Sequence, residues 1–345
     1  MTKLNILDLS IKETELLVEK LGEKKFRAKQ LLNWIYKKNV LDFDLMTNIS
    51  EDFRAKLKLN CTLDIPKIYN HQKSTLDKSH KFLLETIDKN LIESILIIDE
   101  NRSTLCVSCM IGCPLKCKFC ATGSEVQFKR NLTSSEILGQ FIAIQDFMQK
   151  QNISEKITNI VFMGMGEPLL NLENVEKSIQ ILTSMDGFGL SKSRITVSTA
   201  GVTKNLSVFI NKYGVKLAVS VHFPTEEQRL EFMPINKLYS LSNLITELKK
   251  IKLNKRDFIT IEYLMINDIN DSLQHAIKLH KLVSDLKVKI NLIPFNPIKT
   301  FSGKPSEDNK IEKFANYLKS KNIFTTIRKS RGKDTQGACG QFSLK

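Results

Sequence analysis

Short apolar stretches alternate with amphipathic stretches along most of the chain, beginning near residue 103. The apolar stretches are dense in Val, Ile, Leu and Phe, which favour strands, whereas apolar residues recur at helical spacing between them. Thr133-Ser134-Ser135-Glu136 has the pattern of a capping box and predicts the start of the first intervening helix. We expect strands at residues 103–110, 159–165, 194–199, 216–222, 259–265 and 288–293, with a seventh at 323–327. Six strand–helix units predict an α/β fold with a parallel sheet and outer helices, closed or nearly closed into a partial (β/α)6 barrel.

The first hundred residues have a different pattern. Residues 81–87 and 91–98 flank the polar run Asp88-Lys89-Asn90 and predict a β-hairpin, in which Glu93 interrupts an apolar run. The first sixty residues are helical in pattern, with Gly22 joining two amphipathic stretches. We therefore expect a small N-terminal helical domain at 1–62, a β-hairpin extension at 63–102 and the barrel at 103–345.

Several predicted strands end with a polar residue followed by Gly or Pro. This pattern occurs in the segments 164–168, 198–201, 220–224 and 294–297. Each segment alone is more typical of a turn than of a binding site. In a barrel, however, the carboxyl ends of successive strands meet at one rim, where barrel enzymes place their chemistry. The occurrence of this pattern at the ends of four predicted strands therefore predicts a site at that rim.

Charge and cysteine content suggest a partner and a compartment. The chain has 52 Lys and Arg against 37 Asp and Glu, a net charge of +15, which suits a nucleic-acid partner, although a lysine-rich proteome would give the same excess. The helical N-terminal domain, with basic side chains among its polar positions, would then help to bind RNA. Seven clustered cysteines indicate a reducing cytoplasm rather than a disulfide framework. Asp8 interrupts any signal-like apolar core, and no apolar stretch approaches the length of a membrane span, so we expect no membrane partner.

Three of the cysteines have the spacing C-x3-C-x2-C, at Cys113, Cys117 and Cys120. Three thiolates on one loop can bind three irons of a 4Fe-4S cluster and leave the fourth iron open to a small molecule. The alternative is a structural zinc site, which needs four ligands. Cys106 or Cys109 could supply the fourth, but no second C-x2-C pair or H-x3–5-H pattern follows. The spacing therefore favours a catalytic iron–sulfur cluster.

The cysteine motif at the start of a six-unit barrel resembles the radical S-adenosylmethionine (SAM) superfamily. Further motifs are similar to the RlmN/Cfr family of RNA methyltransferases, and to its adenine C2-methyltransferases in particular. These motifs are Met163-Gly-Met-Gly-Glu-Pro-Leu-Leu-Asn171, Asn291-Leu-Ile-Pro-Phe-Asn-Pro297 and Ala338-Cys-Gly-Gln341, with Leu-Gly-Glu-Lys-x-Phe-Arg-Ala near the start. The likeness covers nearly the whole chain.

The resemblance implies methylation of carbon 2 of adenosine 2503 in 23S rRNA and of adenosine 37 in certain tRNAs. Carbon 2 is an electron-poor C–H carbon, so simple displacement on SAM cannot methylate it. The family uses two SAM molecules. One methylates a cysteine, and the second gives a 5′-deoxyadenosyl radical that removes hydrogen from the methylated cysteine. The carbon radical then adds to the base, and the resulting thioether link must be resolved. An electron donor such as a flavodoxin system is also implied.

The resemblance assigns roles to single residues. Cys339 would carry the methyl group, Cys106 would resolve the thioether as its disulfide partner, and Glu93 would accept a proton. Cys106 and Cys109 would face opposite sides of a strand, which leaves Cys109 without a role. The alternatives without a catalytic role are an inert buried thiol at Cys339 and a solvent-facing charge at Glu93. The residues implied in SAM binding are Gly166, Glu167, Ser198, Ser220, Val221, His222 and Asn296.

Two other functions remain open at this point. A Cfr-like enzyme would methylate carbon 8 of the same adenine with the same machinery. A zinc-stabilised RNA-binding protein would have no catalytic activity. The motif at 167–171 and Pro294 resemble the C2-methyltransferases rather than the C8 enzymes.

Overall fold

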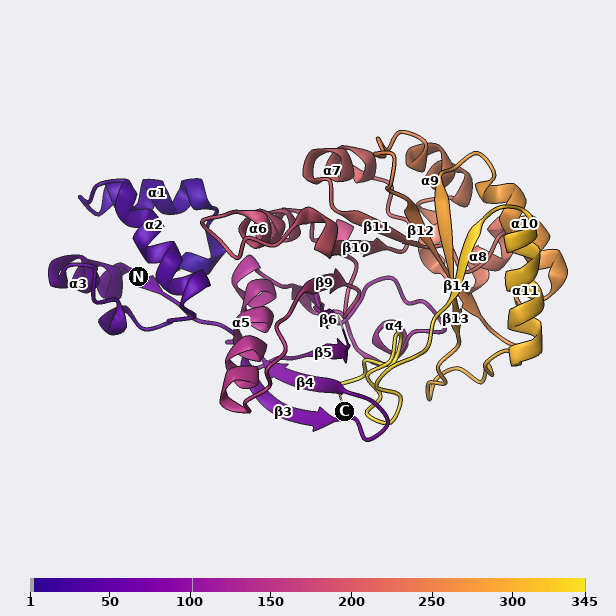
Figure 1. Ribbon diagram of the computed structural model, residues 1–345, viewed down its shortest axis with the longest axis horizontal. Helices are drawn as coiled ribbons and strands as arrows, with labels where there is room; N and C mark the ends of the chain where they lie inside the picture. The colour runs from indigo at the N-terminus through magenta and orange to yellow at the C-terminus, as the bar shows by residue number, and fades with distance from the viewer. Residues whose placement is uncertain (1–2, 101, 345) are drawn as a thin grey trace.

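The computed structural model describes residues 3–100 and 102–344, and a ten-stranded sheet forms its centre (Figure 1). The strand order is β14-β13-β12-β11-β10-β9-β6-β5-β4-β3. Residues 1, 2, 101 and 345, which fall within the predicted segments, lie outside the described part. Seven strands run parallel and form the predicted partial barrel, so the α/β fold class is confirmed. They are β6 (Arg102–Cys106), β9 (Asn159–Phe162), β10 (Ile195–Thr199), β11 (Lys216–Ser220), β12 (Ile259–Met265), β13 (Val288–Pro294) and β14 (Phe324–Ile327).

The first barrel strand is shorter than the sequence predicts. β6 ends at Cys106, and residues 107–109 continue without a regular ladder, with Val107 N bonded to Val161 O and Cys109 N to Met165 O. The expected alternation of Cys106 and Cys109 on one regular strand is therefore wrong. Cys109 instead lies against the next loop, where its sulfur donates to the Met165 carbonyl at 3.6 Å.

The predicted hairpin is confirmed and belongs to the same sheet. β4 (Ser79–Glu85) pairs antiparallel with β5 (Leu91–Asp99), and β5 pairs with β6. A third antiparallel strand, β3 (Lys67–Lys73), forms the edge. Its sequence is mostly polar because most of its side chains face solvent, so no apolar alternation identified it.

Helices cover the barrel, and three more form the N-terminal region, which Figure 1 shows to one side of the sheet. The helices are α1 (Ile11–Lys20), α2 (Phe26–Leu32), α3 (Glu51–Asn60), α4 (Ala121–Glu125), α5 (Ser134–Lys150), α6 (Leu172–Thr183), α7 (Leu206–Tyr213), α8 (Glu226–Phe232), α9 (Leu241–Leu248), α10 (Leu273–Val283) and α11 (Asp308–Ser320). The short strands β1 (Leu4–Asn5) and β2 (Cys61–Thr62) pair with each other, as do β7 (Met110–Ile111) and β8 (Arg130–Asn131). None of the helices in residues 3–100 and 102–344 combines the length and apolar character needed to cross a bilayer.

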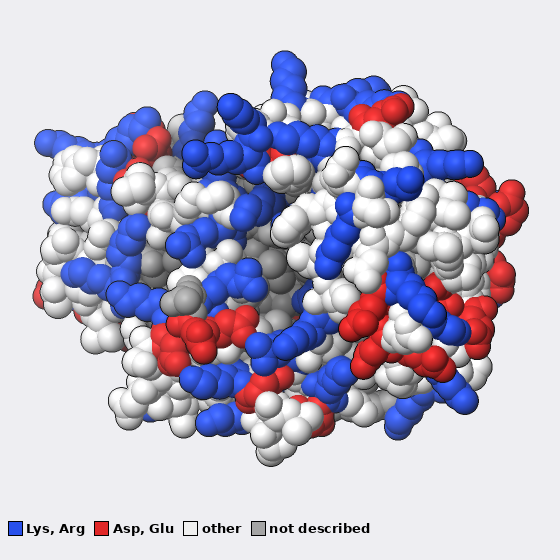
Figure 2. Space-filling view, turned by 45° about the vertical axis from the view of Figure 1, so that its right-hand side comes forward, with Lys and Arg blue, Asp and Glu red and all other residues white. Residues whose placement is uncertain are grey.

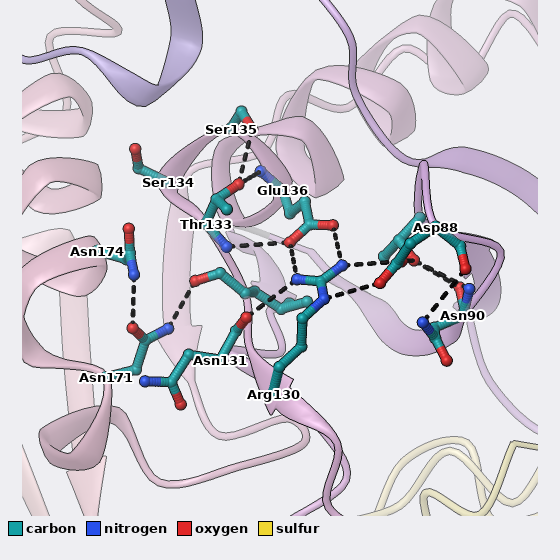
Figure 3. Close-up of polar contacts among 12 residues, drawn as sticks. Asp88, Asn90, Arg130, Asn131, Thr133, Ser134, Ser135, Glu136, Asn171 and Asn174 are labelled. Atoms are coloured by element: carbon teal, nitrogen blue, oxygen red, sulfur yellow. Dashed lines mark hydrogen bonds and ion pairs between the residues drawn. The ribbon is translucent and has the colours of Figure 1, made fainter. Parts of the chain in front are cut away.

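A polar cluster fixes the hairpin to the barrel at the start of α5 (Figure 3). Arg130 donates both terminal nitrogens to the Glu136 carboxylate at 2.7 Å and its Nε to Asp88 at 2.8 Å. Thr133 and Glu136 form the predicted capping box. The planar guanidinium suits two carboxylates at once, so it couples the hairpin turn to the barrel's first helix.

Candidate active site

The predicted site residues gather where the parallel strands end. The loop of residues 112–120, here called the cysteine loop, joins β7 to α4 and carries Cys113, Cys117 and Cys120. Gly112 has φ +74°, and a Cβ there would lie 2.3 Å from the Gln127 carbonyl oxygen, so only glycine fits this turn. Lys116 also has a positive φ, +53°. These conformations fold the loop back on itself and bring its three thiols within electrostatic range of one another.

The three thiols fit the ligand set of an iron–sulfur cluster. Burial raises the pKa of all three, and their mutual repulsion adds to the shift for Cys113 and Cys117, so bound metal is what would hold them as thiolates. Within residues 3–100 and 102–344, no three His, Cys, Asp or Glu side chains are placed to hold one metal ion.

The segment after β9 holds a buried carboxylate beside this loop. Glu167 is 2% exposed; its Oε2 accepts from Ala200 N at 2.7 Å and its Oε1 from Leu169 N at 3.2 Å. Burial raises the pKa of Glu167 to about 7, against these hydrogen bonds. Gly166 has φ +100°, and its bare Cα packs on Met110. A carboxylate held this way is suited to pair with an ammonium group of a ligand.

The ends of β10 and β11 supply the other predicted SAM contacts. Ser198 and Ser220 are half-buried there, and Val221 is buried. His222 has φ +56°, and its Nδ1 accepts from Leu264 N at 3.1 Å. Burial lowers its pKa to about 3, with Arg229 nearby adding to the shift, so His222 is a neutral acceptor. Its ring meets Phe119 of the cysteine loop edge-on, with centroids 5.1 Å apart, and so supports that loop.

Sequence reasoning missed Arg229, which is fully buried on α8 beneath these strand ends. Its guanidinium donates to the carbonyls of Ser220 at 2.8 Å, Val221 at 2.7 Å and Ala200. A Cβ on Gly201, which has φ +105°, would lie 2.7 Å from this guanidinium. The available signal was a charged residue three positions before Phe232, on the buried face of a short helix.

Cys339 lies on the segment 328–342, here called the C-terminal loop, which returns to the site. Asn296 donates to the Cys339 carbonyl at 3.1 Å. The next carbonyl, that of Gly340, accepts at 2.8 Å from the amide of Ala121, the residue that follows Cys120. Thr122 Oγ1 donates to the Phe342 carbonyl at 2.9 Å. The Cys339 side chain is exposed, although Arg328, Glu262 and Cys120 all lie within electrostatic range of it. It is therefore not an inert core thiol.

Cys106 and Cys339 are 233 positions apart in sequence but neighbours in the structure. Burial raises the pKa of Cys106 to about 12, the nearby Cys339 adds to the shift and Arg328 opposes it. Arg328 also lies near Glu262, a buried carboxylate that accepts from Asn291 at 2.8 Å. Neither Arg328 nor Glu262 was singled out from the sequence. Their charges are placed to influence both thiols.

The C-terminal loop is tied to the turn between β3 and β4 by two reciprocal carboxylates. Asp334 accepts from Ser74 Oγ at 2.7 Å and from Thr75 N at 2.7 Å. In the other direction, Asp77 accepts from Gly332 N at 2.9 Å. A Cβ at Gly332 or Gly337 would lie within 2.7 Å of the Ile95 Cδ1 on β5, so both glycines let the loop pack closely on that strand.

Glu93 lies on β5 beneath the end of the same segment. Its side chain is 0% exposed, and Lys81 Nζ lies 2.6 Å from its Oε1. Burial raises the pKa of Glu93, while Lys81 and the amides of Ser343 and Leu344 oppose the shift. The alternative of a solvent-facing charge is wrong. Cys61, by contrast, lies in the N-terminal region on β2, apart from the site.

The face shown in Figure 2 carries many Lys and Arg side chains around a central hollow, while Asp and Glu gather toward its lower and right-hand parts. A predominantly basic face suits a polyanion.

Comparisons with known proteins agree with this geometry. Residues 4–63 match the ribosomal RNA large subunit methyltransferase N-terminal domain, and residues 107–280 match the radical SAM superfamily. The dual-specificity RNA methyltransferase RlmN of Buchnera aphidicola subsp. Schizaphis graminum is 43% identical over 344 residues, 99% of this chain and 94% of that protein. RlmN of the subspecies Cinara cedri is 43% identical over 348 residues, with 99% and 96% covered. A crystal structure of a radical SAM methyltransferase from Sphaerobacter thermophilus superimposes with a TM-score of 0.91 at 32% identity, covering 99% of this chain and all of that one.

Proposed function

The chain belongs to the RlmN family of radical SAM RNA methyltransferases, and we propose that it methylates carbon 2 of adenosine 2503 in 23S rRNA and of adenosine 37 in certain tRNAs. The observation that carries the proposal is that Cys339, on the C-terminal loop beside the cysteine loop, lies within electrostatic range of Cys106. Methylation through a cysteine carrier requires two thiols within reach of each other, one to carry the group and one to release it.

Cys113, Cys117 and Cys120 would hold a 4Fe-4S cluster, with SAM bound at the adjoining strand ends. When bound, the cluster supplies the electron that splits SAM homolytically. Glu167 and Gly166 would receive the SAM amino group, and the residues Ser198, Ser220, Val221, His222 and Asn296 would line the rest of its site. The buried carboxylate of Glu167, held by the amides of Leu169 and Ala200 at the strand ends, supports this assignment.

Cys339 would take a methyl group from one SAM molecule and carry it to the base. Its exposure, on a loop with Gly337 and Gly340, supports a role as a carrier that meets two partners in turn. The Cys106 thiolate would then attack the Cys339 sulfur. A disulfide bond forms as the sulfur–carbon bond to the RNA breaks, and the electron pair of that bond stays on the methylene carbon, which takes up a proton and becomes the methyl group of the base.

Glu93 would accept the proton that carbon 2 loses. Its burial, which raises its pKa above that of an exposed carboxylate, suits a base that must be protonated during turnover. Lys81 would hold it in place and stabilise its charged form.

RNA would reach the site across the basic face, with its adenine flipped out of the stack. In this division of labour, residues 1–62 form an accessory RNA-binding domain, 63–102 an extension and 103–345 the catalytic barrel. A low-potential donor such as a flavodoxin would supply electrons. The cytoplasm, where thiols stay reduced, suits an enzyme whose seven cysteines are all free.

Mass spectrometry of RNA tests the proposal directly. RNA from cells that lack this protein should contain no 2-methyladenosine at the two positions, and wild-type protein should restore it. Protein with Cys339→Ala should not restore it, although its iron and sulfide content stays normal. Methyl groups found on carbon 8 would instead identify the Cfr-like activity, and unchanged 2-methyladenosine would reject both assignments.

A further inference from the structure

Arg229 is a buried positive charge that the roles described so far do not require. Its side chain is completely removed from solvent, and burial lowers its pKa to about 10, so it remains protonated at neutral pH. A buried guanidinium is costly to desolvate and is ordinarily matched by a carboxylate.

The groups that accept hydrogen bonds from Arg229 are all neutral. Besides the three carbonyls at the ends of β10 and β11, they are the Asn236 side-chain oxygen at 3.1 Å and the Met233 sulfur at 3.3 Å. These contacts satisfy the donors without neutralising the charge. The field of the guanidinium therefore extends to its surroundings, where the interior screens it weakly.

That field reaches the two anionic parts of the candidate site. α8, which carries Arg229, ends against the cysteine loop, where the Phe232 carbonyl accepts from Lys118 N at 3.0 Å, next to Cys117. Ala200, whose carbonyl accepts from Arg229, donates its amide to the Glu167 carboxylate at 2.7 Å. The Glu226 carboxylate also lies within range, on the first turn of the same helix. It is bound by Asn236 Nδ2 at 2.7 Å and by the amides of Leu241 and Ser242 at 3.0 Å.

We propose that Arg229 is the buried counter-charge of the iron–sulfur centre and makes that centre easier to reduce. The inference rests on the proposed function, because it requires a cluster on the cysteine loop. A cubane held by three thiolates is negatively charged, and the electron it accepts from the low-potential donor makes it more negative. A fixed positive charge below the loop stabilises the reduced state more than the oxidised one.

Arg229 is thus a positioning and tuning residue rather than one that touches substrate. Its guanidinium group also fixes the carbonyls of Ala200, Ser220 and Val221, next to the proposed SAM contacts. The two roles separate experimentally because lysine keeps the charge but cannot reach three carbonyls at once, while glutamine keeps some hydrogen bonding but no charge.

The test is a mediated redox titration of the anaerobically purified, cluster-loaded protein, followed by electron paramagnetic resonance. Arg229→Gln should shift the midpoint potential to a more negative value. Arg229→Lys should keep a potential close to wild type but bind SAM more weakly. Arg194→Gln, which removes an equal charge just before β10 at the opposite strand end, is the matched control and should leave the potential unchanged. A wild-type potential for Arg229→Gln would overturn the inference.

A second variant decides the question if Arg229→Gln does not assemble a cluster. The exchange Glu226→Gln with Asn236→Asp moves one negative charge next to Arg229 at nearly constant shape and unchanged net charge. It should lower the potential although the arginine and its carbonyl contacts remain, and an unmoved potential would again overturn the inference. Iron analysis distinguishes a failure of the proposed function from a failure of the proposed role of Arg229. Protein without about four irons contradicts the proposed function itself, whereas a normal cluster with an unmoved potential contradicts only the role of Arg229.

Discussion

Gly166→Ala tests whether the close approach beneath the proposed SAM site is as tight as the structure shows. A Cβ at 166 would lie 2.6 Å from both Cβ and Cγ of Met110 and 3.0 Å from its sulfur. Met110 is fully buried on β7, and its Cβ is fixed to the backbone, so it cannot swing away. The φ of +100° is strained for any residue with a side chain.

The expected loss of stability is the sum of two effects. The backbone conformation costs about 1–2 kcal/mol for alanine, and the overlap with Met110 costs about 1–3 kcal/mol more. We therefore expect the free energy of unfolding to fall by about 2–5 kcal/mol. Gly214→Ala is the matched control. It also has a positive φ, +63°, but the nearest atom to its Cβ is Lys192 Cδ at 3.7 Å, so only the backbone effect applies.

Urea unfolding of the two variants, measured at one pH and temperature, gives the comparison. Met110→Ala added to Gly166→Ala should recover part of the loss relative to the sum of the single changes, because it removes the overlap with Cγ and sulfur and leaves only the contact with Cβ. The Gly166 variant should also bind SAM more weakly, because Glu167 follows it directly. Equal losses for the 166 and 214 variants, with no coupling to Met110, would refute the tight packing.

Three more results are expected. Cys106→Ala should accumulate protein covalently bound to RNA, visible as a nuclease-sensitive shift in denaturing gels; unlinked enzyme after turnover would contradict the resolving role. Burial and the neighbouring His71 lower the pKa of His80 to about 4. The stability that neutral His80 contributes should therefore be complete above about pH 6.5 and decline toward pH 4 in urea unfolding, with a flatter profile for His80→Gln. Asp334→Ala should speed hydrogen exchange in residues 330–342 without a matching change in global stability, and unchanged exchange would mean that its bonds to Ser74 and Thr75 do not restrain the loop.

The sequence predicted what depends on local pattern. Barrel strands such as β12 and β13 are dense in buried apolar residues, and the capping box at Thr133 marks the start of α5. The sequence pattern did not reveal β3, because most side chains of this edge strand face solvent and it therefore shows no apolar alternation. Likewise, the early end of β6 follows from bonds to the loop after β9, which no local signal encodes.

In the site, motifs located the cysteine loop and the carboxylates Glu93 and Glu167, but not what surrounds them. The pair Lys81 and Glu93 depends on hairpin register: Leu83 lies opposite Glu93, which makes Lys81 its diagonal neighbour. Arg229, and the approach of Arg328 to Glu262, depend on how separate β/α units pack. Such contacts between distant segments carry no periodic signal in a single sequence.

The path of the C-terminal loop has a consequence for turnover. The sheet is open, and this loop runs from β14 at one edge to the turn beside β3 at the other, held by Gln341 on Pro297 at one side and by Asp334 and Gly332 at the other. The segment that carries Cys339 is thus anchored on both sides of this residue. A large swing of its sulfur would break the hydrogen bonds at one anchor or the other, so the proposed delivery to the base should proceed by small displacements.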